Sequence, residues 1–164
     1  MAAKGPKEWL KENQTVTAED LGNDIWVRIE RTNRVLEKYG RGDFIANMPA
    51  LFAMYYYAAV ALMQIPEDPV GMELQKMYRE NVQNLADECL IEDEDAEGMV
   101  DAFADACRAT AEEYNEARER DGAEFNPFGA IVTAAARTVA LDYSDVRVEL
   151  ANALADFAVS YKVK

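Results

Sequence analysis

Residues 50–65 are apolar on every side if they are helical, and this segment constrains the fold more than any other part of the chain. Pro66 ends it, and Pro49 is expected in its first turn, with Asn47 or Met48 as the cap. Its large apolar residues are Leu51, Phe52, Met54, Tyr55, Tyr56, Tyr57, Val60, Leu62 and Met63. A helix that is hydrophobic all round has to be covered on every side, by other helices or by lipid.

A membrane span explains this segment less well than a buried helix does. Counted from residue 48 to residue 65, the segment has about eighteen residues, which is the lower limit for crossing a bilayer. Its three consecutive tyrosines lie near the middle, whereas the aromatic residues of spanning helices gather at the two interfaces. No basic cluster flanks it. We therefore predict a buried central helix without membrane contact, with partial exposure in a dimer interface as the alternative.

Five other segments repeat apolar residues every three or four positions, as amphipathic helices do. They are residues 17–39, 69–90, 95–120, 127–139 and 144–161, preceded by a short helical stretch at Pro6–Asn13. No segment alternates in the manner of a β-strand. The sequence predicts an all-α fold, a compact single-domain bundle of about six helices with its hydrophobic central helix at about 50–65. The domain covers residues 1–164, with residues 1–16 a candidate for a loosely attached N-terminal segment.

The inward faces of the two middle helices follow from the same spacing. In residues 69–90 we expect Val70, Leu74, Met77, Val82, Leu85 and Cys89 to face the core, and in residues 95–120 we expect Ala96, Val100, Phe103, Cys107, Tyr114 and Ala117. If these helices form a hairpin, Cys89 and Cys107 differ in height by more than ~10 Å, beyond the ~7 Å limit between bridged Cα atoms. Both cysteines are therefore predicted to be free thiols.

The net charge of −14 comes from the middle of the chain. Residues 67–124 contain nineteen acidic and five basic side chains, whereas residues 1–66 and 125–164 are each balanced. A uniformly acidic surface, as in halophilic proteins, would spread its acids over every helix. The imbalance therefore indicates a concentrated acidic face, which suits a basic partner or a cation.

The acids of the helix at 95–120 repeat opposite its apolar side chains, which predicts an exposed acidic face. Its candidate partner-binding residues are Glu94, Glu97, Asp101, Asp105, Glu112 and Glu116. We expect this face to bind a basic protein surface, in a small non-enzymatic adaptor, regulator or inhibitor. A second version of the hypothesis is a nucleic-acid mimic that occupies a DNA-binding cleft.

One helix face carries basic residues, namely Arg28, Arg31, Arg34 and Lys38, but acidic residues surround it. No basic patch dominates the chain, so direct nucleic-acid binding is not expected. The basic face could instead meet the acidic face of a second copy, which leaves a homodimer open.

The stretch Asp93–Asp101 resembles the start of an EF-hand calcium loop, with acids at loop positions 1, 3, 5 and 9 and Gly98 at position 6. Position 12, where the family has a bidentate glutamate, is Ala104. We therefore interpret Asp93 as a helix cap and the acids after it as first-turn residues that favour the helix dipole.

The motif Glu112-Glu113-x-x-Glu116 resembles the all-α nucleoside triphosphate pyrophosphohydrolases. The resemblance implies the alternative function, an Mg²⁺- or Mn²⁺-dependent phosphohydrolase that uses helix carboxylates. In that family the Glu-x-x-Glu motif is accompanied by a Glu-x-x-Asp motif on the next helix, and the carboxylates of both motifs point into a cleft. Residues 69–90 contain no such pair.

The chain contains no histidine. This excludes histidine-activated nucleophiles, most transition-metal and catalytic zinc sites, and Glu-x-x-His di-iron bundles. We predict no catalytic residue, no metal site and no cofactor. Two cysteines do not imply a disulfide framework and no secretory signal is visible, so the cytoplasm is the expected location.

Overall fold

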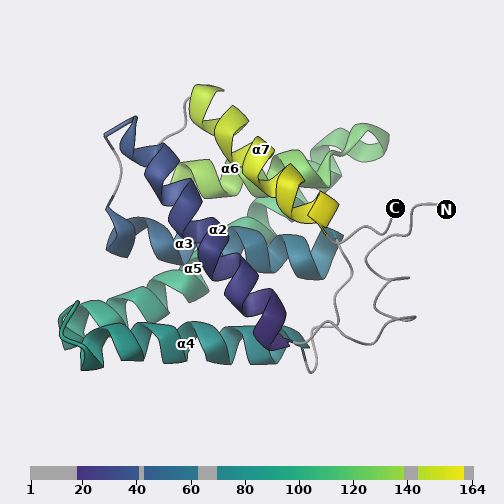
Figure 1. Ribbon diagram of the computed structural model, residues 1–164. Coiled ribbons are helices and arrows are strands. Elements are labelled where there is room, and N and C mark those ends of the chain that lie inside the picture. The colour runs from purple at the N-terminus through teal and green to yellow at the C-terminus, as the bar shows by residue number, and fades with distance from the viewer. Residues whose placement is uncertain (1–17, 41–42, 63–69, 139–143, 161–164) are drawn as a thin grey trace, which may run out of the picture.

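Six α-helices build the part of the chain that the structure, a computed structural model, describes: residues 18–40, 43–62, 70–138 and 144–160 (Figure 1). They are α2 (Ala18–Glu37), α3 (Phe44–Tyr57), α4 (Met72–Asp87), α5 (Asp93–Asp121), α6 (Pro127–Thr138) and α7 (Ser144–Ser160). A π-helical turn, η1 (Ala58–Leu62), follows α3, and a 3₁₀ turn, η3 (Gly122–Glu124), follows α5. The described ranges contain no strand, so the predicted all-α bundle is confirmed. The predicted stretch Pro6–Asn13 lies outside them.

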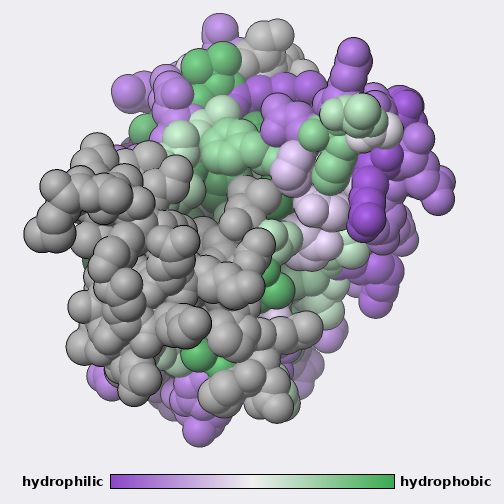
Figure 2. Space-filling view, turned by 90° about the vertical axis from the view of Figure 1, so that its right-hand side faces the viewer, coloured by the Kyte–Doolittle hydropathy of each residue, from purple (hydrophilic) through white to green (hydrophobic). Residues whose placement is uncertain are grey.

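α3 is the central helix of the bundle, as predicted. Every residue from Asn47 to Tyr56 is buried, and α2, α5 and α6 pack around the helix (Figure 1). The window Phe44–Ala61 is long and apolar enough to cross a membrane, but 67% of it is buried within the molecule. Figure 2 shows one side of the bundle, on which hydrophilic groups gather toward the edge and apolar groups are visible nearer the middle.

α3 begins earlier than the sequence predicted. Asp43 caps it, because the Asp43 Oδ1 atom accepts a hydrogen bond from the backbone N–H of Ile45 at 3.1 Å. Pro49 therefore lies inside the helix, and both predicted caps are helical residues. One of them, Asn47, is buried and donates a hydrogen bond to the Asn33 side chain of α2 at 2.9 Å.

The three consecutive tyrosines of α3 each contact a different neighbour. The Tyr55 hydroxyl lies 3.0 Å from the Thr32 hydroxyl of α2, and the Tyr56 hydroxyl accepts a hydrogen bond from Gln75 of α4 at 2.8 Å. The Tyr57 ring packs on α5. α3 is thus bound to three surrounding helices through polar and aromatic contacts as well as through aliphatic packing.

α4 pairs with α5 as expected, and Leu74 and Val82 are buried as predicted, while Met77 and Leu85 are half-buried. Its buried residues are Leu74, Tyr78, Val82 and Ala86. Tyr78 lies at the centre of this face, since its hydroxyl donates to the backbone carbonyl of Met99 and its ring packs on Phe103. The prediction for Cys89 was wrong, because this residue is exposed.

Cys89 is exposed because α4 ends at Asp87 and the chain turns away from the core. The N–H of Leu90 bonds to the carbonyl of Leu85 at 2.9 Å, and the N–H of Cys89 bonds to the carbonyl of Ala86 at 3.0 Å. These are the two hydrogen bonds of a Schellman motif. Cys89 has φ 59°, the left-handed conformation that the motif needs and that glycine adopts most easily. Both cysteines of the chain are free, as predicted.

The remaining helices follow the predicted pattern closely. Asn126 caps α6 by accepting a hydrogen bond from the N–H of Gly129 at 3.1 Å, and Pro127 is the first helical residue. The residues that repeat at helical spacing on one side of α2 and of α7 are buried: Leu21, Ile25, Ile29, Thr32 and Leu36 on α2, and Val146, Leu150, Leu154 and Phe157 on α7. These stripes close the bundle over one side of α3.

Candidate functional site

An acidic wall runs along α5. We define it as Glu94, Glu97, Asp101, Asp105, Glu112 and Glu116, and all six side chains are exposed, as predicted. They follow one another on one side of a single helix over about 33 Å. Asp105 accepts a hydrogen bond from Arg108 at 3.1 Å, an exposed pair of the kind that contributes little stability.

The opposite side of α5 holds the wall in place. Its buried residues are Ala96, Met99, Phe103, Ala106, Thr110 and Ala117. The Phe103 ring meets the Phe52 ring of α3 edge to face, with 5.5 Å between centroids. The Thr110 hydroxyl donates to the backbone carbonyl of Ala106 at 2.7 Å, so its burial leaves no unpaired donor. The acidic wall is therefore displayed on a helix that the core fixes along its length.

Residues 93–101 are helical and do not form an EF-hand loop. α5 begins at Asp93, and its N-cap is Glu92, whose side chain makes no capping hydrogen bond. The prediction that Asp93 is the cap was wrong by one residue. The interpretation of the acids as first-turn residues is supported, because Asp93, Glu94 and Asp95 occupy the first turn of α5. Each carboxylate there stabilises the helix by about 0.3–1 kcal/mol through its interaction with the helix dipole.

A groove of about 560 Å³ between α4 and α5 flanks the N-terminal half of the wall. Glu97 and Asp101 line it together with Arg79 of α4, and its floor includes Val82 and Val100. Carboxylates above an apolar floor suit the side chain of lysine or arginine, whose aliphatic stem can lie on apolar surface while its charge meets an acid.

A second groove, of about 300 Å³, lies between α5 and α6 beside the C-terminal half of the wall. Glu112 and Glu116 line it. In the same groove Arg137 of α6 donates to Glu113 at 2.8 Å, and the Glu113 side chain is only 12% exposed. Glu113 thus links α5 to α6, while the neighbouring acids of the wall stay open to solvent.

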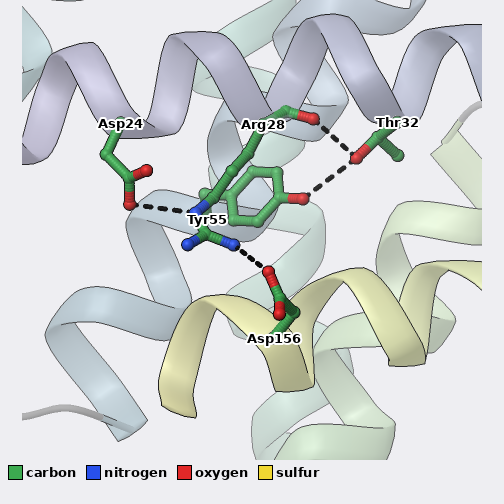
Figure 3. A network of polar contacts seen from close by, with 5 residues as sticks. All are labelled: Asp24, Arg28, Thr32, Tyr55 and Asp156. Carbon is green, nitrogen blue, oxygen red and sulfur yellow. Dashed lines mark hydrogen bonds and ion pairs between the residues drawn. The ribbon is translucent and has the colours of Figure 1, made fainter. Parts of the chain in front are cut away.

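A second polar feature joins α2 to α7 around a buried arginine (Figure 3). Arg28 is 8% exposed, and it donates through Nε to Asp24 at 2.9 Å and through Nη1 to Asp156 at 2.7 Å. Its guanidinium also lies 5.3 Å from the centre of the Phe157 ring. Burial lowers the pKa of a guanidinium, but the two carboxylates outweigh it, so the pKa of Arg28 is raised.

Tyr55 extends this network into the core (Figure 3). The Thr32 hydroxyl donates its single proton to the backbone carbonyl of Arg28 at 2.8 Å. In the 3.0 Å contact between the two hydroxyls, Tyr55 is therefore the donor and Thr32 the acceptor. Burial raises the pKa of Tyr55, which keeps that donor protonated.

A hollow of about 270 Å³ lies on the seam between α2 and α7, above the Tyr55 ring. Its lining residues are Arg28, Arg31, Thr32, Val35, Tyr55, Glu149, Asn152, Ala153 and Asp156. Sequence reasoning missed this feature, because it placed Arg28 on an exposed basic face. Arg28 in fact belongs to the buried side of α2, and the exposed basic face consists of Arg31, Arg34 and Lys38 alone.

The carboxylates of the described residues do not converge on a metal site. No group of three or more histidine, cysteine, aspartate or glutamate side chains among these residues is placed to hold a metal ion. The buried polar residues of the described chain are Arg28, Thr32, Asn33, Asn47 and Thr110, none of them acidic. In this part of the molecule the acids are a surface feature.

Comparison with known proteins adds no relative. No protein-family model matches the chain. No curated protein and no solved structure matches it either.

Proposed function

We propose that this protein is a small non-enzymatic interaction protein that binds a basic partner along the acidic wall. The observation that carries the proposal is the exposure of all six carboxylates of the wall on one helix. Such a line of like charges repels itself, and an opposite charge on a partner offsets this cost. The wall steers the encounter and selects the partner, while the two flanking grooves receive side chains of the partner.

The spacing of the wall favours a basic protein segment over mimicry of nucleic acid. The six carboxylates are spaced on average by about 6–7 Å along the helix axis. Each strand of B-DNA carries one phosphate per ~3.4 Å of axis. The wall alone thus has about half the charge density of one strand. The apolar floor beside Glu97 and Asp101 also fits the aliphatic stems of lysine and arginine side chains.

The phosphohydrolase alternative requires carboxylates that converge in a cleft to hold Mg²⁺ or Mn²⁺. Among the described residues the acids of α5 lie on the outer side of the helix, and none of them is fully buried. Glu113 is the least exposed carboxylate of the Glu112-Glu113-x-x-Glu116 motif, and it forms an ion pair with Arg137. No observation in the described part of the chain favours this second function.

The test measures how a short peptide rich in arginine and lysine associates with the full chain at low and at moderate salt. We expect the association rate to fall steeply as salt rises, because exposed charges are screened beyond ~8 Å at physiological ionic strength. Replacing Asp101, Asp105, Glu112 and Glu116 by lysine should abolish this dependence and leave the helical circular-dichroism signal unchanged.

A matched control variant makes the same change of net charge elsewhere. Replacing Glu30, Glu37, Glu73 and Glu80 by lysine alters four exposed acids on α2 and α4. If this variant loses peptide binding as completely as the wall variant does, net charge alone is responsible and the proposal fails. Retention of the salt-dependent rate in the control variant supports the wall as the binding surface.

A further inference from the structure

The α2–α7 face combines exposed apolar side chains with exposed basic ones. Four large hydrophobic residues are exposed in the described chain, and two of them belong to this face: Val27 on α2 is 45% exposed and Val148 on α7 is 57% exposed. Val27 lies one turn before Arg31, and Val148 one turn before Asn152. Since Arg31 and Asn152 both line the hollow on the seam, the two valines flank that hollow.

Charge on this face is divided between its two helices. α2 presents Arg31, Arg34 and Lys38, for which the described residues provide no ion-pair partner within 4.0 Å. α7 presents Asp145, Glu149 and Asp156. The face as a whole is nearly neutral, in a protein whose net charge of −14 makes two copies repel over most of their surface.

The two helices run antiparallel, so the opposite charges are matched along the seam (Figure 1). Arg28 is level with Asp156, as their 2.7 Å contact shows. Lys38 is ten residues after Arg28, and Asp145 is eleven residues before Asp156, which are nearly equal distances along two antiparallel helices. Lys38 is therefore level with the start of α7.

We propose that the α2–α7 face is the interface of a symmetric homodimer. A two-fold axis parallel to the seam places α2 of each copy on α7 of the other, at the same height along the seam. Lys38 then meets Asp145 of the second copy, and Arg31 lies over the hollow between Asn152 and Asp156. A two-fold axis across the seam would instead place α2 on α2 and bring basic residues together.

The size of the face sets the expected strength of the dimer. α7 is about 25 Å long, and two adjacent helices are about 20 Å wide, so each copy offers roughly 500 Å². Stable interfaces use about 800 Å² per partner. We therefore expect a dissociation constant in the micromolar range.

The test uses two complementary charge reversals in the full chain, Lys38→Glu and Asp145→Lys. In either variant alone the dimer contains two like-charge contacts, and we expect its dissociation constant to rise by about tenfold or more. In an equimolar mixture each contact again joins opposite charges, so the mixed dimer should form with nearly the wild-type constant. Analytical ultracentrifugation, and native mass spectrometry with one variant isotope-labelled, measure both quantities.

Controls separate this interface from other contacts between copies. Lys76→Glu makes the same charge change as Lys38→Glu, at an exposed position of α4, and should leave the dissociation constant unchanged. Monomeric wild-type protein at about 100 μM, or a mixture that stays as weak as the single variants, would overturn the proposal. So would loss of the dimer on reversal of Glu112 and Glu116, since this outcome means that the basic face binds the acidic wall head to tail.

Discussion

Arg28 of α2 and Asp156 of α7 are 128 residues apart in the sequence, and 2.7 Å separates Arg28 Nη1 from Asp156 Oδ2. The contact joins the first and last described helices over one side of the central α3. The side chain of Arg28 is 10% exposed, whereas that of Asp156 is 70% exposed and that of Asp24 is 33% exposed. Burial therefore removes water mainly from the arginine, while the two carboxylates stay more hydrated. In this sense the network is asymmetric.

This asymmetry predicts the outcome of removing either partner. Replacing both Asp24 and Asp156 by asparagine leaves a buried guanidinium without these carboxylates, and should cost about 3 kcal/mol of unfolding free energy. Arg28→Met keeps the volume and leaves two acids that water can reach, so it should cost about 1 kcal/mol or less. Urea unfolding of the three proteins measures both values. The reverse order would mean that the charge on Arg28 adds net stability.

The sequence could predict most of the helices because their apolar spacing is regular. It placed Leu21, Ile25, Ile29 and Leu36 correctly, since residues three or four apart necessarily share a helix face. The same rule also places Arg28 on the buried side of α2. Leu21, Ile25, Arg28 and Thr32 follow one another at steps of four, three and four, so Arg28 belongs to the buried stripe. Its partner Asp156 was not predictable, because no local pattern links α2 to α7.

The errors occurred where a hydrogen bond decides the structure. Proline suggested that α3 begins at Pro49, but the Asp43 side chain caps an earlier turn. Apolar spacing gave Cys89 an inward position, but α4 ends at Asp87, where the N–H of Leu90 bonds to the carbonyl of Leu85 and the chain turns away from the core. For the acidic wall, spacing was sufficient to predict exposure, since exposure depends only on which side of α5 is apolar. Its role stays a proposal.

Cys89→Gly should stabilise the protein. Cys89 has φ 59° at the end of α4, where a residue with a Cβ atom is strained and glycine is not. After the entropy that glycine loses on folding is subtracted, we expect a gain of about 0.5 kcal/mol. Cys89→Ala is the matched control, because alanine removes the thiol but keeps the Cβ atom. If both variants gain equally in thermal unfolding, the thiol and not the backbone causes the effect.

Leu51→Ala should be far more damaging than any change on the acidic wall. Leu51 is fully buried in α3, so truncation leaves a cavity and should cost about 2–5 kcal/mol. Val60 is half-buried, and Val60→Ala should cost less. Glu116→Gln should stay within about 0.5 kcal/mol of wild type, because the side chain is exposed among like charges. Comparable losses at Leu51 and Glu116 in chemical denaturation would contradict the division into core and wall.

The two thiols should differ in reactivity. Cys89 is exposed, whereas Cys107 is half-buried and its pKa is raised to about 11 by burial. Because the thiolate is the reactive form, iodoacetamide at about pH 8 should modify Cys89 first. Peptide mass spectrometry over a time course distinguishes the sites. If Cys107 is modified as fast as Cys89 in the folded protein, the α5 face that carries Cys107 must open readily.

Stability should fall as the pH rises above about 9, because Cys107 keeps its proton in the folded protein. Burial raises the pKa of Cys107 from 9.0 to about 11, so between these values the unfolded chain has lost a proton that the folded chain still binds. The stabilisation is complete below pH 9 and is lost as the pH rises through about 11, at up to ~1.4 kcal/mol per pH unit. Burial also raises the pKa of Tyr78, which extends the loss to higher pH. Urea unfolding of wild type and Cys107→Ala at several pH values measures the slopes. The variant should show the shallower slope between pH 9 and 11, and equal slopes would exclude Cys107 as the cause.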